Sequence, residues 1–350
     1  MAKFVDDTYS HLVSDIDKMR LRHRQYISYS NELGAKSVTD EIINNALDEC
    51  RNPRSPGKHI HITFTEKDGA IMVEDDGRGI PTNILEELFT SLNMGSNIYT
   101  SKKAGLKAET LGQNGTGTLA ICALAAQVEI ISYRGGTENA YRHLVFEEGV
   151  KVSDESGKCE PNKHGMSIRY IPSKVMGKNT RIVWKDIHEE LLNIQYLNRN
   201  KISIDSTHID KDGKETKEKY PSMAFVEILN RNGADSFIST KYAISINADG
   251  VIEELDGENV KRFIEMDIAF AFTNQLNPYI DSFSNSNNTV DNGDHLDGAM
   301  EAICRFFQNG TRAMMGDKER EKLDIKWDDV RTGLTIAVAL RTNYERLYTG

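Results

Sequence analysis

The sequence is poor in the features that mark secreted, metal-bound and membrane-spanning proteins. Its four cysteines are scattered and form no C-x-x-C pair, which argues against a structural zinc site and favours reduced thiols in a cytosolic setting. The nine histidines show no metal-ligand spacing. No stretch approaches the roughly 18 consecutive apolar residues of a membrane-spanning helix, and the first residues lack the pattern of a secretory signal. These absences predict a cytoplasmic protein.

An excess of positive charge is also lacking. The chain has 43 Lys and Arg against 53 Asp and Glu, which gives a formal net charge of -10. A protein that holds DNA by its phosphates usually carries a basic surface. A role on DNA would therefore need a local groove, or another subunit that supplies most of the grip. With 350 residues, the chain is long enough to predict two domains.

Hydrophobic periodicity and turn residues divide the chain into two mixed α/β parts, with a boundary near residue 220. In the first part we expect helices at 11–29, 38–50, 83–93, 118–126 and 186–196, and strands at 59–65, 70–75, 127–133, 140–146, 165–171, 180–184 and 201–205. A polar, glycine-punctuated stretch at 94–111 is typical of a mobile loop, and 210–219 of a hairpin tip or linker. The second part is expected to contain strands at 242–248, 265–272 and 335–341 and a helix at 294–308.

Three short segments in a fixed order carry the chemistry, and the first lies on the helix expected at 38–50. At about 100° per residue, Glu41, Asn45 and Asp48 fall on one stripe flanked by apolar residues. Glu41 is placed to act as a general base towards a water molecule. Asn45, one turn later, offers a hard oxygen ligand to Mg²⁺. Taken alone, this pattern is equally that of a surface helix with a polar face.

The second segment, Glu74-Asp-Asp-Gly-Arg-Gly-Ile-Pro81, leaves a strand and turns sharply at two glycines. Asp75 stands where the strand ends, so its carboxylate can accept a hydrogen bond from the amino group of adenine; guanine presents a carbonyl there. Gly79 lets the backbone approach a flat base, and Arg78 can pair with Glu49 on the preceding helix. The alternative is an acidic calcium loop, but the carboxylate spacing does not fit an EF-hand.

The third segment, Gly112-Gln-Asn-Gly-Thr-Gly117, precedes an apolar helix that starts at Thr118. Glycines bare the backbone N–H groups, and a helix N-terminus adds partial positive charge, so this segment predicts a phosphate loop. Lysines in the preceding polar stretch can close over the phosphates. The segment is neither a P-loop, since it lacks G-K-[ST], nor a Rossmann fingerprint, since it follows a loop. A helix with a flexible glycine cap is the alternative.

The order of these segments resembles the GHKL ATPases, which include gyrase, histidine kinases and MutL. The resemblance implies a two-layer α/β sandwich that binds ATP and Mg²⁺, with 94–111 as a lid. In the family a Gly-Thr pair places a hydroxyl beside the adenine-reading carboxylate, but this chain has Gly165-Met166, so that hydroxyl is missing. With Glu41 as the catalytic base and Asn45 as the Mg²⁺ ligand, the expected ATP-binding residues are Asn45, Glu49, Asp75, Arg78, Gly79, Ile80, Pro81, Lys102, Lys103, Lys107, Gly112, Gln113, Asn114, Gly115, Thr116, Gly117, Thr118 and Met166.

Motifs along nearly the whole chain narrow the resemblance to the ATPase half of type IIA DNA topoisomerases, such as gyrase B and ParE. They are Asp17–Ile27, Leu192–Asn198, Ala224–Asn230, Ser282–Thr289 with Asn292–His295, and Asp329–Leu334. This likeness implies an α+β chain with a GHKL ATPase domain at 1–220. A transducer domain with an α/β fold like that of ribosomal protein S5 would follow at 221–350. The chain ends just before the family's Gln-Thr-Lys loop and lacks the DNA-cleaving tyrosine domain, as in an N-terminal fragment or a small subunit.

The function implied is an ATP-hydrolysing clamp of a type IIA topoisomerase, the N-gate, which closes by ATP-driven dimerisation to capture and pass a DNA duplex. Its expected partners are a second copy, the DNA duplex and a subunit or domain that carries the cleavage tyrosine. Two alternatives stay open. One is another GHKL machine, a chaperone or a mismatch-repair-type clamp; the other is a nucleotide-binding regulator without turnover.

Overall fold

The structure of the chain is a computed structural model. It describes residues 14–27, 30–52, 54–92, 116–198, 202–232, 237–255, 258–285, 287–289, 293–315 and 326–342. The expected lid at 94–111 and most of the expected phosphate loop therefore lie outside the described residues.

An eight-stranded sheet forms the larger layer. Its strands are β1 (His59–Thr65), β2 (Ala70–Asp75), β3 (Ala125–Arg134), β4 (Ala140–Glu147), β5 (Val150–Lys158), β6 (His164–Pro172), β7 (Ser203–Ile209) and β8 (Glu215–Lys219). They lie in the order β5-β4-β3-β6-β2-β1-β7-β8, and only the pairing of β1 with β7 is parallel among these neighbours. Alternation of side chains on β1 buries Ile60, Ile62 and Phe64 on one face.

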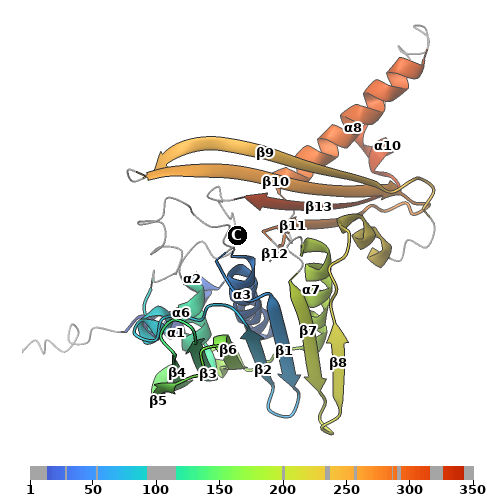
Figure 1. Cartoon of the computed structure of the whole chain (residues 1–350). Helices are drawn as coiled ribbons and strands as arrows, with labels where there is room; N and C mark the ends of the chain where they lie inside the picture. Colours follow the sequence, from blue (N-terminus) through green and yellow to red (C-terminus); the bar gives the residue numbers. More distant parts are fainter. Residues whose placement is uncertain are drawn as a thin grey trace, which may run out of the picture.

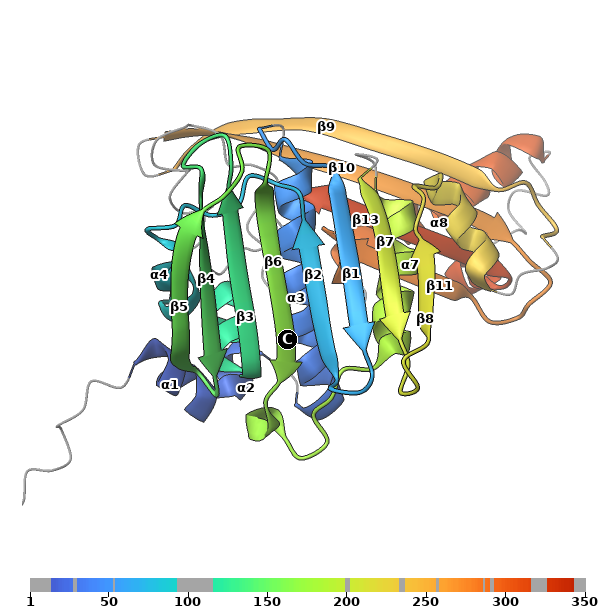
Figure 2. The same ribbon diagram turned by 60° about the horizontal axis from the view of Figure 1, so that its bottom comes forward.

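Helices cover that one face, and the other face of the sheet is open in Figure 2. They are α1 (Asp15–Leu21), α2 (His23–Tyr26), α3 (Asn31–Arg51), α4 (Leu85–Thr90), α6 (Gly117–Ala123), the 3₁₀ turn η1 (Lys174–Met176) and α7 (Trp184–Leu197). The central helix α3 buries Val38, Ile42 and Ala46 against the sheet, because apolar residues recur at helical spacing along its sequence. This packing leaves the polar stripe of α3 beside the end of β2.

A five-stranded sheet forms the smaller layer. The elements of this part are η2 (Phe225–Asn232), β9 (Tyr242–Leu255), β10 (Glu258–Phe272), β11 (Tyr279–Ser284), β12 (Asn287–Asn288), α8 (Asp294–Met314), α10 (Trp327–Arg331) and β13 (Leu334–Thr342). The strands lie in the order β12-β11-β13-β10-β9. Figure 1 shows α8 leaving the sheet and extending away from the larger layer, after packing its first turns on one face.

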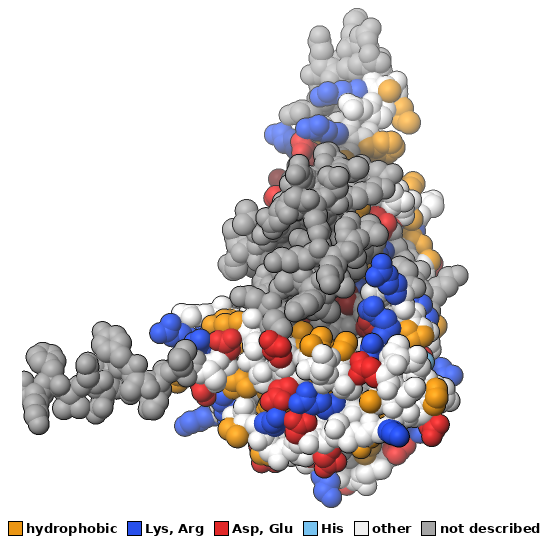
Figure 3. Space-filling view, turned by 60° about the vertical axis from the view of Figure 1, so that its left-hand side comes forward, with side chains coloured by type: hydrophobic (Ala, Val, Ile, Leu, Met, Phe, Trp, Pro, Cys, Tyr) orange, Lys and Arg blue, Asp and Glu red, His pale blue; other side chains and the backbone are white. Residues whose placement is uncertain are grey.

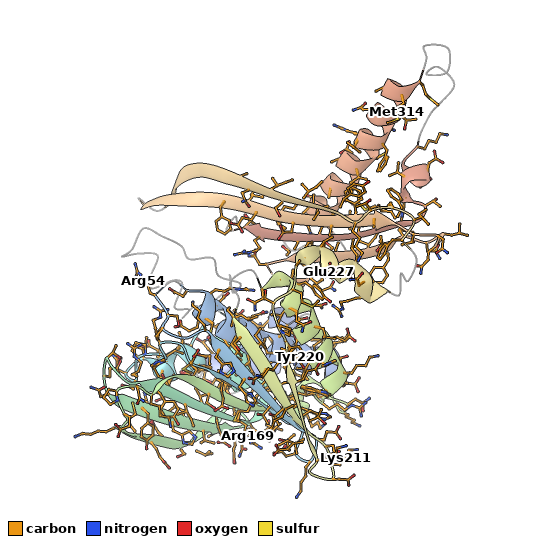
Figure 4. The ribbon with its side chains drawn as sticks, turned by 45° about the vertical axis from the view of Figure 1, so that its right-hand side comes forward. Arg54, Arg169, Lys211, Tyr220, Glu227 and Met314 are labelled. Atoms are coloured by element: carbon orange, nitrogen blue, oxygen red, sulfur yellow. The ribbon has the colours of Figure 1, made fainter. Side chains whose placement is uncertain are left out.

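Small side chains on the five-stranded sheet allow it to pack against η2 and the end of α7. The lower face of the five-stranded sheet presents Ala269 and Ala337, so the 3₁₀ segment η2 can approach it closely and place Ile228 in contact. Leu197 at the end of α7 packs in the same cluster. Figure 4 shows this junction, with Glu227 of η2 at the level where α7 meets the sheet and Tyr220 below it. The C-terminal end of α7 therefore contacts the five-stranded sheet.

Most expected elements are present. The strands at 59–65 and 70–75 have the expected bounds, and the helix expected at 38–50 is longer, since it begins at Asn31. The strand expected at 180–184 is wrong: Thr180 closes a turn on Gly177, and residues beyond it enter α7 at Trp184. Strand β5 was not predicted, because its side chains are mostly exposed and its sequence after Val152 is almost wholly polar. The division at residue 220 stays a prediction, with β8 ending at Lys219 and η2 beginning at Phe225.

Within the described ranges, no helix combines the length and the apolar character needed to cross a membrane.

Core packing of β13 gives a stability prediction. Ile336 is fully buried in the centre of the five-stranded sheet, so Ile336→Ala should lower the free energy of unfolding by about 2–5 kcal/mol through lost burial and a cavity. Ile238→Ala is the matched control, because Ile238 is 70% exposed. Urea unfolding measures both variants. Equal losses in the two variants would contradict the assigned core.

Candidate functional site

The first and third predicted segments meet through Glu41 and Gly117. Glu41 lies on α3, and Gly117 is the first residue of α6. A Cβ atom on Gly117 would lie 1.9 Å from Oε1 of Glu41, far closer than any real contact. Only glycine fits at the start of α6 while Glu41 keeps this position. The steric requirement for glycine at position 117 is therefore set by the carboxylate that the sequence predicted as a base.

Glu41 lies in an environment that favours its protonated form. Burial raises the pKa of Glu41 above its ordinary value, while a hydrogen bond from the side-chain amide of Asn45 acts in the opposite direction. The two residues are one helical turn apart, so the contact follows from the spacing on α3. A raised pKa makes a carboxylate a stronger proton acceptor, which suits general-base chemistry.

Glu49 and Arg78 form a two-pronged ion pair. Nε and Nη2 of Arg78 donate to the two carboxylate oxygens of Glu49 at 2.9 and 2.8 Å, and the backbone N–H of Arg78 donates to Oε1 at 2.8 Å. Burial acts to raise the pKa of Glu49, but the hydrogen bonds from Arg78 lower it below its ordinary value. The pairing expected from the sequence is present, and it fixes the turn after β2 to the last part of α3.

Asp75 is a buried carboxyl group at the end of β2. Its Oδ1 accepts a hydrogen bond from the backbone N–H of Gly77 at 2.8 Å, and the backbone N–H of Met166 on β6 donates to the same side chain. Burial raises the pKa of Asp75 to about 7, and the nearby charges of Glu49 and Asp76 add to the rise, while the two N–H donors oppose it. Asp75 therefore changes its charge within the physiological pH range.

The turn after Asp75 is held close to β3 and β6. Gly79 has a φ of +67°, and a Cβ atom there would lie 2.3 Å from the carbonyl oxygen of Tyr133, so both its conformation and its surroundings require glycine. The next residue, Ile80, donates its N–H to Oγ of Ser132 at 2.8 Å and accepts from the same hydroxyl at 2.7 Å. The backbone of the second segment is thereby clamped on both sides.

Three residues of this clamp were not predicted from the sequence. Ser132 is fully buried on β3, directly opposite Met166 on β6. Arg134 donates through Nη1 to the carbonyl oxygens of Arg78 and Gly79 at 2.9 and 3.1 Å, and Nδ1 of His164 lies 2.9 Å from the carbonyl oxygen of Gly77. A signal existed in the sequence: Ser132 and Arg134 are polar residues on a strand that is otherwise largely apolar.

The remaining predicted residues that the structure describes lie near Asp75 or at the start of α6. Ile80 and Met166 are half-buried against the core beside Asp75, and Pro81 follows on the same turn. Thr118 donates its hydroxyl to the carbonyl oxygen of Leu88 at 2.9 Å, so this side chain joins α6 to α4. Thr116 precedes α6 as its N-cap residue. The other predicted residues of the loop and lid lie outside the described residues: Lys102, Lys103, Lys107, Gly112, Gln113, Asn114 and Gly115.

The side chain of Asn45 suits a magnesium ion whose other ligands are mainly water and phosphate oxygens. Asn45 uses its amide N–H groups towards Glu41, which leaves its carbonyl oxygen as a neutral ligand of the kind that Mg²⁺ accepts. Among the residues that the structure describes, no group of three or more His, Cys, Asp or Glu side chains is arranged to hold a metal ion. A magnesium ion that keeps waters and binds phosphate oxygens needs only one or two protein ligands.

Two protein-family models match separate parts of the chain. The family described as "Histidine kinase-, DNA gyrase B-, and HSP90-like ATPase" matches residues 30–182, and the family described as "DNA gyrase B" matches residues 223–346. The first range contains every part of the site described above, and the second contains the five-stranded sheet. A curated relative, the B subunit of DNA topoisomerase 4 from Staphylococcus aureus (strain MW2), is 28% identical over 98% of this chain. The chain spans about half the length of that relative, since the match covers 50% of it.

Solved structures share the fold. The B subunit of DNA gyrase from Myxococcus xanthus matches 96% of this chain and 88% of its own with a TM-score of 0.67 at 15% identity. The ATPase domain of Thermus thermophilus gyrase B, solved with an aminocoumarin, matches 97% of this chain and 84% of its own with a TM-score of 0.63 at 20% identity. The expected fold class, a two-layer α/β sandwich followed by a smaller α/β part of the gyrase B kind, is confirmed.

The raised pKa of Asp75 predicts a pH-dependent stability difference. A carboxyl group whose pKa is higher in the folded state contributes stability at low pH that is lost as the pH rises towards about 7. Asp75→Asn cannot lose a proton there, so its unfolding free energy relative to the wild type should rise by roughly 3 kcal/mol between pH 5 and pH 8. Urea unfolding across this range measures the difference. A difference that stays constant with pH would contradict the assignment.

Proposed function

The chain belongs to the GHKL-type ATPases of type IIA DNA topoisomerases, and from this premise we propose that it binds ATP and hydrolyses it at Glu41. The observation that carries the proposal is the close approach of Glu41 on α3 to Gly117 at the start of α6. Near its C-terminal end, the same helix α3 holds Arg78 through Glu49. One helix, α3, thereby supports the proposed base, the proposed metal ligand and, through Glu49, the turn that follows Asp75. Hydrolysis of a phosphoanhydride depends mainly on such positioning and on charge neutralisation.

Asp75 supplies the selection for adenine in this proposal. Its ionised carboxylate accepts a hydrogen bond from the exocyclic amino group of adenine, whereas the carbonyl group of guanine would face it as a second acceptor. A mismatched buried acceptor loses its partner and pays the desolvation cost. The clamp made by Ser132 and Arg134 keeps the backbone around Gly79 in place, so the flat base has a fixed wall to lie on.

Glu41 supplies the proton acceptor for the attacking water. The contact from Asn45 orients its carboxylate, and the missing Cβ of Gly117 allows the carboxylate to occupy this position. Mg²⁺, held through the carbonyl oxygen of Asn45 and by the nucleotide, would neutralise phosphate charge when bound. Lys102, Lys103, Lys107 and the loop Gly112–Gly117 are proposed to contact the phosphates, with 94–111 as the lid.

The wider role proposed is that of the N-gate of a type IIA topoisomerase. ATP binding would join two copies through the part at 1–220, and the part at 221–350 would transmit the change to a subunit or domain that carries the cleavage tyrosine. The charge distribution supports passage of a DNA duplex rather than tight binding of it. The net charge is -10, and Figure 3 shows Lys and Arg intermixed with Asp and Glu over the described part of the face that it presents. A DNA duplex would pass this clamp rather than be held by it.

Two substitutions separate binding from turnover. Glu41→Gln should retain binding of a non-hydrolysable ATP analogue while lowering ATP turnover by about 100-fold or more, because it removes the base and keeps the shape. Asp75→Ala should abolish analogue binding, because the adenine loses its acceptor. Calorimetric titration and a coupled phosphate-release assay measure the two quantities. A wild-type chain that binds the analogue without any turnover would instead be a nucleotide-binding regulator.

Gly117→Ala tests the meeting of the two segments. The added methyl group must displace Glu41, since the two would lie 1.9 Å apart, so turnover should fall by about tenfold or more. Gly298→Ala is the matched control, because a Cβ atom at Gly298 on α8 meets nothing within 4 Å. Equal turnover in both variants would show that Glu41 is not held against α6.

A further inference from the structure

A buried group of charges joins α3 to α7. Nζ of Lys36 bonds Oδ2 of Asp40 one turn along α3 and lies 3.9 Å from Oε2 of Glu190 on α7. Glu190 is only 8% exposed. The other oxygen of Asp40, Oδ1, is buried and accepts no hydrogen bond from any residue that the structure describes. Buried charges of this kind persist only while their partners stay in place.

The charges in this group depend on one another. Burial raises the pKa of Glu190 to about 7, with Asp40 adding to the rise and Lys36 opposing it. Burial likewise raises the pKa of Asp40, which Lys36 opposes and Asp186 reinforces. Burial alone would lower the pKa of Lys36, yet the two carboxylates raise it above its ordinary value. One lysine thus serves two buried carboxylates, so any displacement of α7 changes the surroundings of Asp40.

From Glu190 the contacts continue to the second sheet. The side chain of Asn193, one turn along α7, donates to Glu190, and Nη1 of Arg231 donates to Oδ1 of Asn193. Nη2 of Arg231 also bonds Oε2 of Glu189 at 2.7 Å. Arg231 belongs to η2, whose Ile228 packs under the five-stranded sheet. Figure 4 shows η2 in this position, with its labelled Glu227 between α7 and that sheet.

We propose that Lys36, Asp40, Glu190, Asn193 and Arg231 form a coupling network that links the position of α3 to that of the five-stranded sheet, with Glu190 as its central positioning residue. Asp40 directly precedes Glu41, so the network ends beside the proposed base. A shift of η2 relative to α7 must either move Glu190 or leave a buried carboxylate without its partners. The sheet and the hydrolysis site are thereby held in register. The part of this inference that concerns turnover rests on the proposed ATP hydrolysis.

Amide hydrogen exchange without nucleotide tests the network directly. Arg231→Gln, a change in η2, should raise the exchange rates of the α3 amides at 36–43 by about threefold or more. The same change in a Glu190→Gln background should have no such effect on α3, because the route is already broken. Arg305→Gln is the matched control, since Arg305 pairs with Glu301 on the exposed side of α8. Unchanged α3 exchange in Arg231→Gln, or an equal effect in both backgrounds, would overturn the proposal.

Steady-state turnover gives the second readout. Glu190→Gln should lower kcat by about fivefold or more while KM stays within about twofold, because Glu41 is misplaced and the adenine contacts are untouched. A general loss of folding would lower the active fraction of enzyme, so kcat is referred to sites titrated with the ATP analogue. Equal kcat in Glu190→Gln and the wild type would overturn the link to Glu41. If the wild type binds no analogue, the proposed function fails, while the exchange experiment still judges the network.

Discussion

The geometry of the proposed site rests on the two-pronged ion pair between Glu49 and Arg78. It ties the last turns of α3 to the turn that follows Asp75 at the end of β2 and contains Gly79. A pair of this geometry is stronger and more directional than a single charged contact, and partial burial reduces its screening by solvent. Since Glu41 and Asn45 lie on the same helix, the pair also fixes the proposed base and the proposed metal ligand relative to Asp75. Loss of the ion pair would remove the side-chain link between α3, which carries Glu41 and Asn45, and the turn after β2.

The proposed site holds its two carboxyl groups in buried surroundings. Burial raises the pKa of both Glu41 and Asp75, but their partners differ. Asp75 receives backbone N–H groups, which favour its ionised, accepting form, whereas Glu41 receives one side-chain amide and lies beside a bare glycine. These environments suit a fixed hydrogen-bond acceptor and a proton acceptor respectively. The same physics recurs at Glu190, where buried carboxylates share one lysine and so link two elements.

The sequence was most informative where local rules decide the structure. Alternation at 59–65 and an apolar run at 70–75 defined β1 and β2 to the residue, and helical spacing brought Glu41 and Asn45 to one side of α3. Local patterns were misleading where tertiary contacts decide the structure. Residues 180–183 have strand-like side chains but pair with no strand that the structure describes, and the polar β5 forms a strand because β4 is adjacent. The contribution of Ser132 and Arg134 was likewise hidden, because it arises from the pairing of β3 with β6 and not from any local motif.

Comparative titration of the chain with non-hydrolysable analogues of ATP and GTP, each with Mg²⁺, would measure whether Asp75 selects adenine. We expect saturable binding of the adenine nucleotide and at least about 100-fold weaker binding of the guanine nucleotide, because Asp75 can accept a hydrogen bond only from the former. Binding of the two with equal affinity, or binding of neither, would contradict the assignment of Asp75 and of the site built around it.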